Sequence, residues 1–125
     1  MHQLIDLLKQ ASAILEPFTR NVGASTLVYD GTRYAPGVAQ SPEPYALAWW
    51  SSFQTTIAML DGLETLTPSQ LDYLQHSLCG GMGSFGDFSL DEARLGASAT
   101  KANRDLTRIR ASLYDTLNHF DAKVA

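Results

Sequence analysis

Apolar residues recur at spacings of three and four along most of this chain, which is the pattern that one buried face of an α-helix produces. The spacing predicts helices over residues 3–18, 44–61 and 98–122, and a further helix that begins after Thr67. The segment 44–61 carries apolar residues on a second edge as well, so we expect it to be the most buried helix. The fold class that this pattern predicts is mainly α, with about four principal helices in an irregular bundle.

The stretch Thr67-Pro68-Ser69-Gln70 is the clearest helix start in the sequence. A threonine N-cap, a proline at the first helical position and a glutamine three residues after the threonine form a capping box. Gly80-Gly81 then ends this helix, as glycine commonly does just past a helix C-terminus. A second capping box at Ser89-Leu90-Asp91-Glu92 predicts a short helix through Leu95.

Residues 19–43 lack a helical pattern. Pro17 and the pair Asn21 and Gly23 are expected to end the first helix, and Ser25–Tyr29 has the composition of a short strand. No second clear strand follows, and an isolated hairpin is only marginally stable in water. We therefore expect a long loop or a small hairpin after the first helix.

The composition is that of an ordinary globular protein. A length of 125 residues with 45% hydrophobic residues predicts a single helical domain over residues 1–125. The one cysteine cannot form an intramolecular disulfide, and the N-terminal stretch lacks the apolar run of a signal peptide. The most apolar stretch is too short and too polar to span a bilayer. These features predict a cytoplasmic protein that has no contact with a membrane.

Acidic residues are concentrated in the middle of the chain. The net charge is −4, and residues 61–100 hold six acidic residues against one arginine. This balance argues against binding to nucleic acid, whereas an acidic surface attracts a basic partner. The alternative is an ordinary solvated face. The candidates for contact with a partner are five of these acids and one tryptophan: Asp61, Glu64, Asp72, Asp87, Asp91 and Trp50.

Trp49 and Trp50 are adjacent in the predicted helix over 44–61, so their side chains diverge by about 100°. We favour a helix that is nearly surrounded and buries both rings. The alternative is that one ring is exposed at an interface, where tryptophan is enriched.

The most unusual stretch is Gly80-Gly81-Met82-Gly83-Ser84-Phe85-Gly86-Asp87, which holds four of the nine glycines. Phosphate-binding loops place glycines between a strand and a helix N-terminus, usually with a lysine. Here a helix precedes the glycines and no lysine lies among them. We favour a structural loop that ends the helix and turns Met82 and Phe85 into the core. The residues assigned to this loop are Gly80, Gly81, Met82, Gly83, Ser84 and Phe85.

Asn103 and Arg110 lie about two turns apart on the last predicted helix, at the edge of its apolar face. Polar side chains in such a place often bond to the backbone of a loop. We predict that Arg110 or Asn103 reaches backbone carbonyls of residues 80–87. The alternative is that both are solvated.

The sequence offers little for catalysis or metal binding. His76 and Cys79 share a helix face, but a catalytic cysteine needs a base oriented by a third group, and none is evident. A cysteine-dependent enzyme is the weaker alternative. The three histidines are scattered without the spacing of metal ligands, so we expect no metal and no cofactor.

Residues 80–87, followed by Asn103–Tyr114, resemble a family of small bacterial proteins of unknown function. That family has a GGMGSFND-like loop and then a helix of N-x-x-L-x-x-L-R-x-x-L-Y character. The likeness covers the C-terminal third of the chain and departs from the family at Gly86, where asparagine is usual. Proteins of this kind look like immunity or accessory proteins of bacterial antagonism systems, and the resemblance implies no catalytic residues.

These observations predict a non-enzymatic protein-binding domain. We expect an immunity protein that neutralises a bacterial toxin by direct contact and occlusion of its active site, and the toxin is expected to be basic around that site. The alternative function is a small-molecule or nucleotide-binding regulatory domain that uses the Gly80–Asp87 loop.

Overall fold

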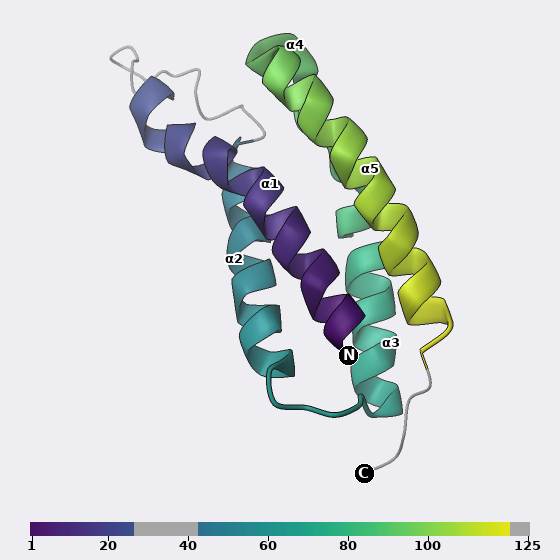
Figure 1. Cartoon of the computed structure of the whole chain (residues 1–125). Coiled ribbons are helices and arrows are strands. Elements are labelled where there is room, and N and C mark those ends of the chain that lie inside the picture. Colours follow the sequence, from purple (N-terminus) through teal and green to yellow (C-terminus); the bar gives the residue numbers. More distant parts are fainter. Residues whose placement is uncertain (27–42, 121–125) are drawn as a thin grey trace.

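The computed structural model describes residues 1–26 and 43–120 (Figure 1). The elements are α1 (His2–Thr26), α2 (Glu43–Leu60), α3 (Pro68–Cys79), the 3-10 helix η3 (Phe85–Asp87), α4 (Glu92–Leu95) and α5 (Ala97–Asn118). Four of these helices are long enough to form the body of a small bundle, which confirms the predicted fold class.

α1 is longer than the sequence predicts. It continues through Pro17 to Thr26, so the predicted end near Pro17 is wrong, and Ser25 and Thr26 are helical rather than the start of a strand. Proline removes one helical hydrogen bond, but the buried Phe18 ties the following turn to the core. The rest of the predicted loop or hairpin, residues 27–42, lies outside the described residues.

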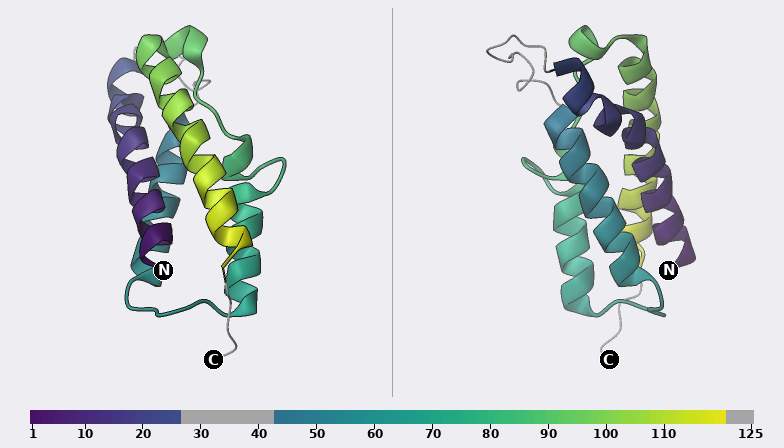
Figure 2. Two further views of the ribbon diagram at one scale, coloured as in Figure 1. Left: turned by 45° about the vertical axis from the view of Figure 1, so that its right-hand side comes forward. Right: turned by 90° about the vertical axis from the view of Figure 1, so that its left-hand side faces the viewer.

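The helices pack in the order α2, α1, α5 and α3 (Figures 1 and 2). α1 packs on α2 and on α5, and α5 also packs on α3. α3 has 12 residues and α5 has 22, which correspond to lengths of about 18 Å and about 33 Å. The shorter α3 therefore covers only part of α5, and η3 lies just beyond the C-terminal end of α3 (Figure 1).

The core consists of the apolar faces of the long helices. The predicted face of the last helix is confirmed by the burial of Ala102, Leu106, Ile109, Leu113 and Leu117. The prediction that 44–61 is the most buried helix is wrong, because Leu47 and Met59 on α2 are 41% and 45% exposed. Within the described part of the chain, no helix combines the length and apolar character needed to cross a membrane.

The capping box at the start of α3 is confirmed. Gln70 N donates to Thr67 Oγ1 at 3.2 Å, and Thr67 N donates to Gln70 Oε1 at 2.9 Å. The start of α4 differs from the prediction, because Asp91 Oδ1 rather than a Ser89 box accepts the hydrogen bond from Ala93 N, at 3.1 Å. The helix nevertheless ends at Leu95, as predicted.

Replacement of the α3 cap by alanine, Thr67→Ala, should lower the free energy of unfolding by about 1 kcal/mol, because it leaves a backbone N–H at the helix start without its acceptor. Urea denaturation measures this change. The control is Ser69→Ala, an exposed serine in the same first turn, which should change the free energy by less than about 0.5 kcal/mol. Equal effects of the two substitutions would contradict the role of the cap.

Candidate functional site at the glycine loop

The glycine loop, residues 80–87, begins where α3 ends. Gly80 has an extended backbone, and its N–H donates to His76 O at 3.2 Å. A Cβ at Gly80 would lie 2.5 Å from His76 O, so no larger residue fits there without a shift of the backbone. The glycine is therefore required by a close approach of the chain rather than by a left-handed conformation.

Ser84 links two parts of the loop backbone by hydrogen bonds. Its buried hydroxyl donates to Gly80 O at 2.6 Å and accepts from Gly86 N at 3.1 Å. The backbone N–H of Ser84 donates to Gly81 O at 3.0 Å, and that of Asp87 donates to Ser84 O at 3.0 Å. The loop thus satisfies several of its own donors, and this geometry disfavours a phosphate-binding loop, which needs free N–H groups.

Phe85 fills the space that the short α3 leaves open. It is fully buried, its ring centroid lies 4.8 Å from that of Phe53 in an edge-to-face arrangement, and it lies 5.5 Å from that of Trp49. Such aromatic pairs are stabilising beyond the area that they bury. The prediction that Phe85 points into the core is confirmed.

Met82 lies in the opposite direction, and the prediction that it is buried is wrong. Its side chain is 96% exposed. The hydrogen bond from Ser84 N to Gly81 O closes a four-residue turn in which Met82 and Gly83 are the central residues, and Gly83 has φ of 86°. A type II turn requires this positive φ at its third residue, and its central residues face outward.

Arg110 on α5 forms hydrogen bonds to the backbone of the glycine loop and of Phe88, and the bond to the loop confirms the prediction from the sequence. Its Nε donates to Phe85 O at 3.0 Å, and a second guanidinium nitrogen donates to Phe88 O. The guanidinium carbon lies 4.8 Å from the centroid of the Phe85 ring, within the range of a cation–π contact. Burial lowers the pKa of the Arg110 guanidinium, which nevertheless remains charged in proteins.

Asn103 holds the next segment rather than the glycine loop. Its Oδ1 accepts from Leu90 N at 2.8 Å, and its Nδ2 donates to Leu90 O at 2.9 Å and to Glu92 Oε2 at 2.8 Å. Hydrogen bonds from Asn103 and then from Thr100 lower the pKa of the Glu92 carboxyl. Asn103 and Arg110 together fix the chain between α3 and α5.

A hollow opens between the glycine loop and the first turns of α2. It has a volume of about 330 Å³, and we call it the aromatic hollow after its lining residues Tyr45, Trp49, Gly83, Ser84, Asp87 and Phe88. Tyr45 is 65% exposed, and the Asp87 side chain is also exposed. The aromatic hollow brings one of the predicted partner-binding acids beside three aromatic rings.

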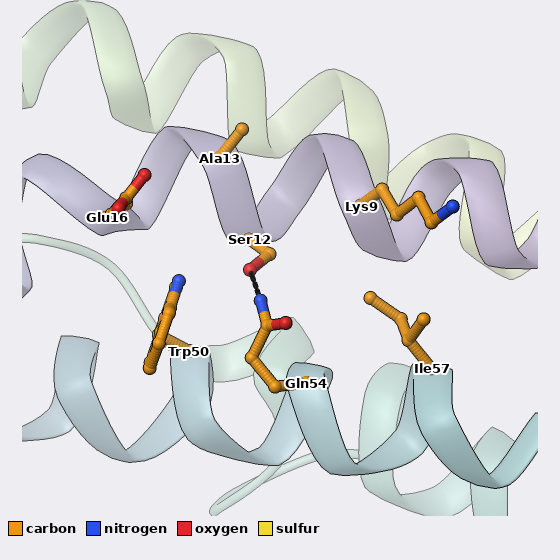
Figure 3. Close-up of a pocket in the computed structure, with 7 residues that line it drawn as sticks. All are labelled: Lys9, Ser12, Ala13, Glu16, Trp50, Gln54 and Ile57. Atoms are coloured by element: carbon orange, nitrogen blue, oxygen red, sulfur yellow. Dashed lines mark hydrogen bonds between the residues drawn. The ribbon is translucent and has the colours of Figure 1, made fainter.

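Trp50 lies on a different side of α2, in a second hollow of about 350 Å³ between α1 and α2 (Figure 3). Gln54 Nε2 donates to Ser12 Oγ across this hollow, with Lys9 and Glu16 on either side of that bond (Figure 3). Both tryptophans are half-buried, so the prediction that α2 buries both rings is wrong. The helix packs mainly on α1 and is not surrounded.

The predicted acidic surface is divided along the bundle. Asp61 and Glu64 are exposed in the connection from α2 to α3, at the end of the bundle opposite α4 (Figure 1). Asp72 lies exposed on α3, with its carboxylate 3.4 Å from His76 Nδ1. Asp91 lies directly before α4, at the other end. These acids therefore do not form a single patch, and only Asp87 lines the aromatic hollow.

Cys79 and His76 line a hollow of about 200 Å³ between α3 and α5, together with Tyr114. Burial raises the pKa of the Cys79 thiol, which is the opposite of the shift that activates a nucleophilic cysteine. Within residues 1–26 and 43–120, no three His, Cys, Asp or Glu residues form a group that would hold a metal ion.

Comparison with protein-family models, with curated proteins and with solved structures finds no match. The fold itself defines a small helical bundle with an ordered loop between two of its helices. The likeness to a family of small bacterial proteins stays a prediction from residues 80–87 and 103–114.

Substitution of the residue that holds the glycine loop, Arg110→Lys, should lower the free energy of unfolding by about 2 kcal/mol, because lysine keeps the charge but cannot reach both carbonyls at once. Urea denaturation measures the loss. Arg108→Lys is the matched control, since Arg108 lies on the same helix and forms an exposed ion pair with Asp105. The role of Arg110 is refuted if the two variants lose the same stability.

Removal of the Asn103 amide, Asn103→Ala, should raise the pKa of the Glu92 carboxyl towards its ordinary value of 4.5, and Thr100→Ala should raise it by less. Carboxyl carbon chemical shifts followed over pH measure both. The lowered pKa means that Glu92 stabilises the fold above the unfolded pKa and that this contribution is lost as pH falls through the folded pKa. The stability difference between wild type and Glu92→Gln should therefore shrink in acid. An unchanged Glu92 pKa in Asn103→Ala would disprove this account.

Proposed function

We propose that this chain is a non-enzymatic protein-binding domain whose contact surface centres on the glycine loop. The observation that carries the proposal is the side chain of Met82, which is 96% exposed at the outer turn of the loop. The backbone of this loop is fixed by hydrogen bonds from Ser84 within it and from Arg110 on α5. Phe85 is buried three residues later, and Arg110 bonds to its carbonyl. The loop thus holds the side chain of Met82 in water while Ser84 and Phe85, two and three residues later, are buried.

Several properties of the loop suit a binding surface. Binding residues commonly lie on loops that a rigid scaffold positions. Methionine is flexible and polarisable, so it adapts to different apolar surfaces. Exposed Tyr45 and Asp87 lie close by at the aromatic hollow and add an aromatic ring and a charge to the surface. An apolar centre with polar and aromatic neighbours resembles a protein interface more than a small-molecule site.

The state of Cys79 supports a role without catalysis. Its raised pKa keeps the thiol protonated at neutral pH, and a protonated thiol is a poor nucleophile. Cys79 also lies half-buried at the end of α3, where free cysteine behaves as a small apolar residue.

Within this class, the narrower proposal is an immunity protein of the cytoplasm that neutralises a bacterial toxin by direct contact and active-site occlusion. It rests on the resemblance of residues 80–87 and 103–114. The toxin surface is proposed to be basic, and Asp87 is the acid placed to face it. Asp61, Glu64, Asp72 and Asp91 lie away from the glycine loop and take no part in the central contact. Trp50 is likewise assigned to the second hollow.

A photo-reactive amino acid placed at Met82 should form one discrete covalent adduct with a partner protein on irradiation of the native host. The reason is that this position lies at the centre of the proposed contact. The same amino acid at Met59, an exposed methionine near the far end of α2, is the control and should not form that adduct. Gel shift and mass spectrometry measure both.

No adduct from position 82, or the same adduct from both positions, would contradict protein binding through the glycine loop. The identity of the captured partner tests the narrower proposal separately. A toxic enzyme with a basic active site supports an immunity protein. A partner without toxicity would contradict immunity while leaving the protein-binding domain in place.

A further inference from the structure

We infer that the aromatic hollow is a recognition site for the basic side chain, arginine or lysine, of a protein partner. Its aromatic walls and its carboxylate both favour a cation over a neutral or negative group. The cationic chemistry follows from the hollow itself, and the assignment of the cation to a protein rests on the function proposed above.

Two of the three aromatic walls, Trp49 and Phe88, are held in place before any ligand arrives. The Trp49 ring packs on two buried rings, with centroids 5.9 Å from Phe53 and 5.5 Å from Phe85. Phe88 stacks 6.4 Å from Phe85, and its carbonyl accepts a hydrogen bond from Arg110. An aromatic face attracts an ammonium or guanidinium group electrostatically, with tryptophan the strongest of the three ring types. These two preformed rings lose little side-chain entropy on binding.

Asp87 supplies the negative charge of the hollow. Its backbone N–H donates to Ser84 O at 3.0 Å, so the residue is fixed within η3 while its side chain stays exposed. Among the side chains that the structure describes, no basic group forms an ion pair with the Asp87 carboxylate. An incoming cation would therefore meet both an aromatic face and an unneutralised carboxylate, which bind cations by the same electrostatic attraction.

The size and position of the hollow favour a side chain over a free ion. A volume of about 330 Å³ lies at the lower end of the range of about 300–1,000 Å³ for ligand sites, which suits a single side chain. Gly83, which lines the hollow, directly follows the exposed Met82. A protein that inserts a basic side chain here would also cover Met82, whereas a small cation would leave Met82 in water.

The test is an NMR titration that follows the indole N–H signals of Trp49 and Trp50. The probe is the blocked peptide acetyl-Gly-Arg-Gly-amide, the neutral control is acetyl-Gly-Gln-Gly-amide, and methylammonium chloride is the small cation, all at one ionic strength. Trp49 should shift saturably with the arginine peptide. Trp50 should not, because its hollow lies on the other side of α2 and is lined by Lys9 as well as Glu16.

Variants then assign the binding to the hollow. Asp87→Asn should weaken binding of the arginine peptide by about two- to fivefold, the range of an exposed ion pair, and Asp87→Glu should restore most of it. Tyr45→Ala should also weaken binding. Because the Tyr45 side chain is exposed, this variant should keep its fold, and the amide spectrum checks that it does. Asp61→Asn removes the same charge at the far end of the bundle and should bind as wild type does.

Equal shifts with the neutral peptide, or Asp87→Asn binding as tightly as wild type, would overturn the cation site. Methylammonium binding as tightly as the arginine peptide would overturn the assignment to a protein side chain. Failure of the cation site and failure of the protein-binding function can be told apart. If the titration fails while the adduct at position 82 forms, the hollow is excluded and protein binding stands. If the arginine peptide binds and no adduct forms, the cation site stands and the protein-binding function is lost.

Discussion

The buried ring of Phe85 is the contact on which the arrangement of this bundle depends. α3 is too short to cover α5 along its length, and Phe85 occupies the open space against Phe53 and Trp49 of α2. Arg110 of α5 bonds to its carbonyl and lies over its ring. One residue of a loop therefore joins two helices that are distant in sequence, and a loop with this role must have a fixed backbone.

A fixed backbone explains why the glycine loop exposes one apolar side chain, Met82, and buries another, Phe85. The turn closed by Ser84 N and Gly81 O places Met82 outside because Phe85 must be inside. The same turn brings Gly83 and Asp87 beside Tyr45 and creates the aromatic hollow. The features that suit a partner are thus direct results of how the core is completed at this point. This link between packing and surface supports the proposals made for Met82 and for the hollow.

Features set by local chemistry were predictable from the sequence, and features set by tertiary contacts were not. The capping box of Thr67 and Gln70 involves residues three apart, so the pattern alone identified it. Pro17 is a local helix breaker, but the packing of α1 overrides it. Met82 and Phe85 are both apolar and lie three apart, and only the turn geometry decides which is buried.

The acidic residues illustrate the same limit at the level of the surface. Asp61 and Asp87 belong to the same acidic stretch of the sequence, but α3 lies between them and carries them to different levels of the bundle. The predicted hydrogen bond from Arg110 to the glycine loop is confirmed, because Arg110 lies at the edge of the apolar face of α5 and its side chain reaches the carbonyl of Phe85. A high density of acidic residues along the sequence therefore predicts an acidic patch only where those residues belong to the same part of the fold.

The position of Phe85 between α2 and α5 also links the loop to the stability of the whole chain. Opening the loop would remove Phe85 from its contacts with both helices, so the loop belongs to the same cooperative unit as the core. A ligand that binds only the closed loop must then stabilise the entire bundle, in proportion to the logarithm of its concentration over its dissociation constant. Occupation of this one surface would thus set how long the folded protein survives proteolysis in a cell.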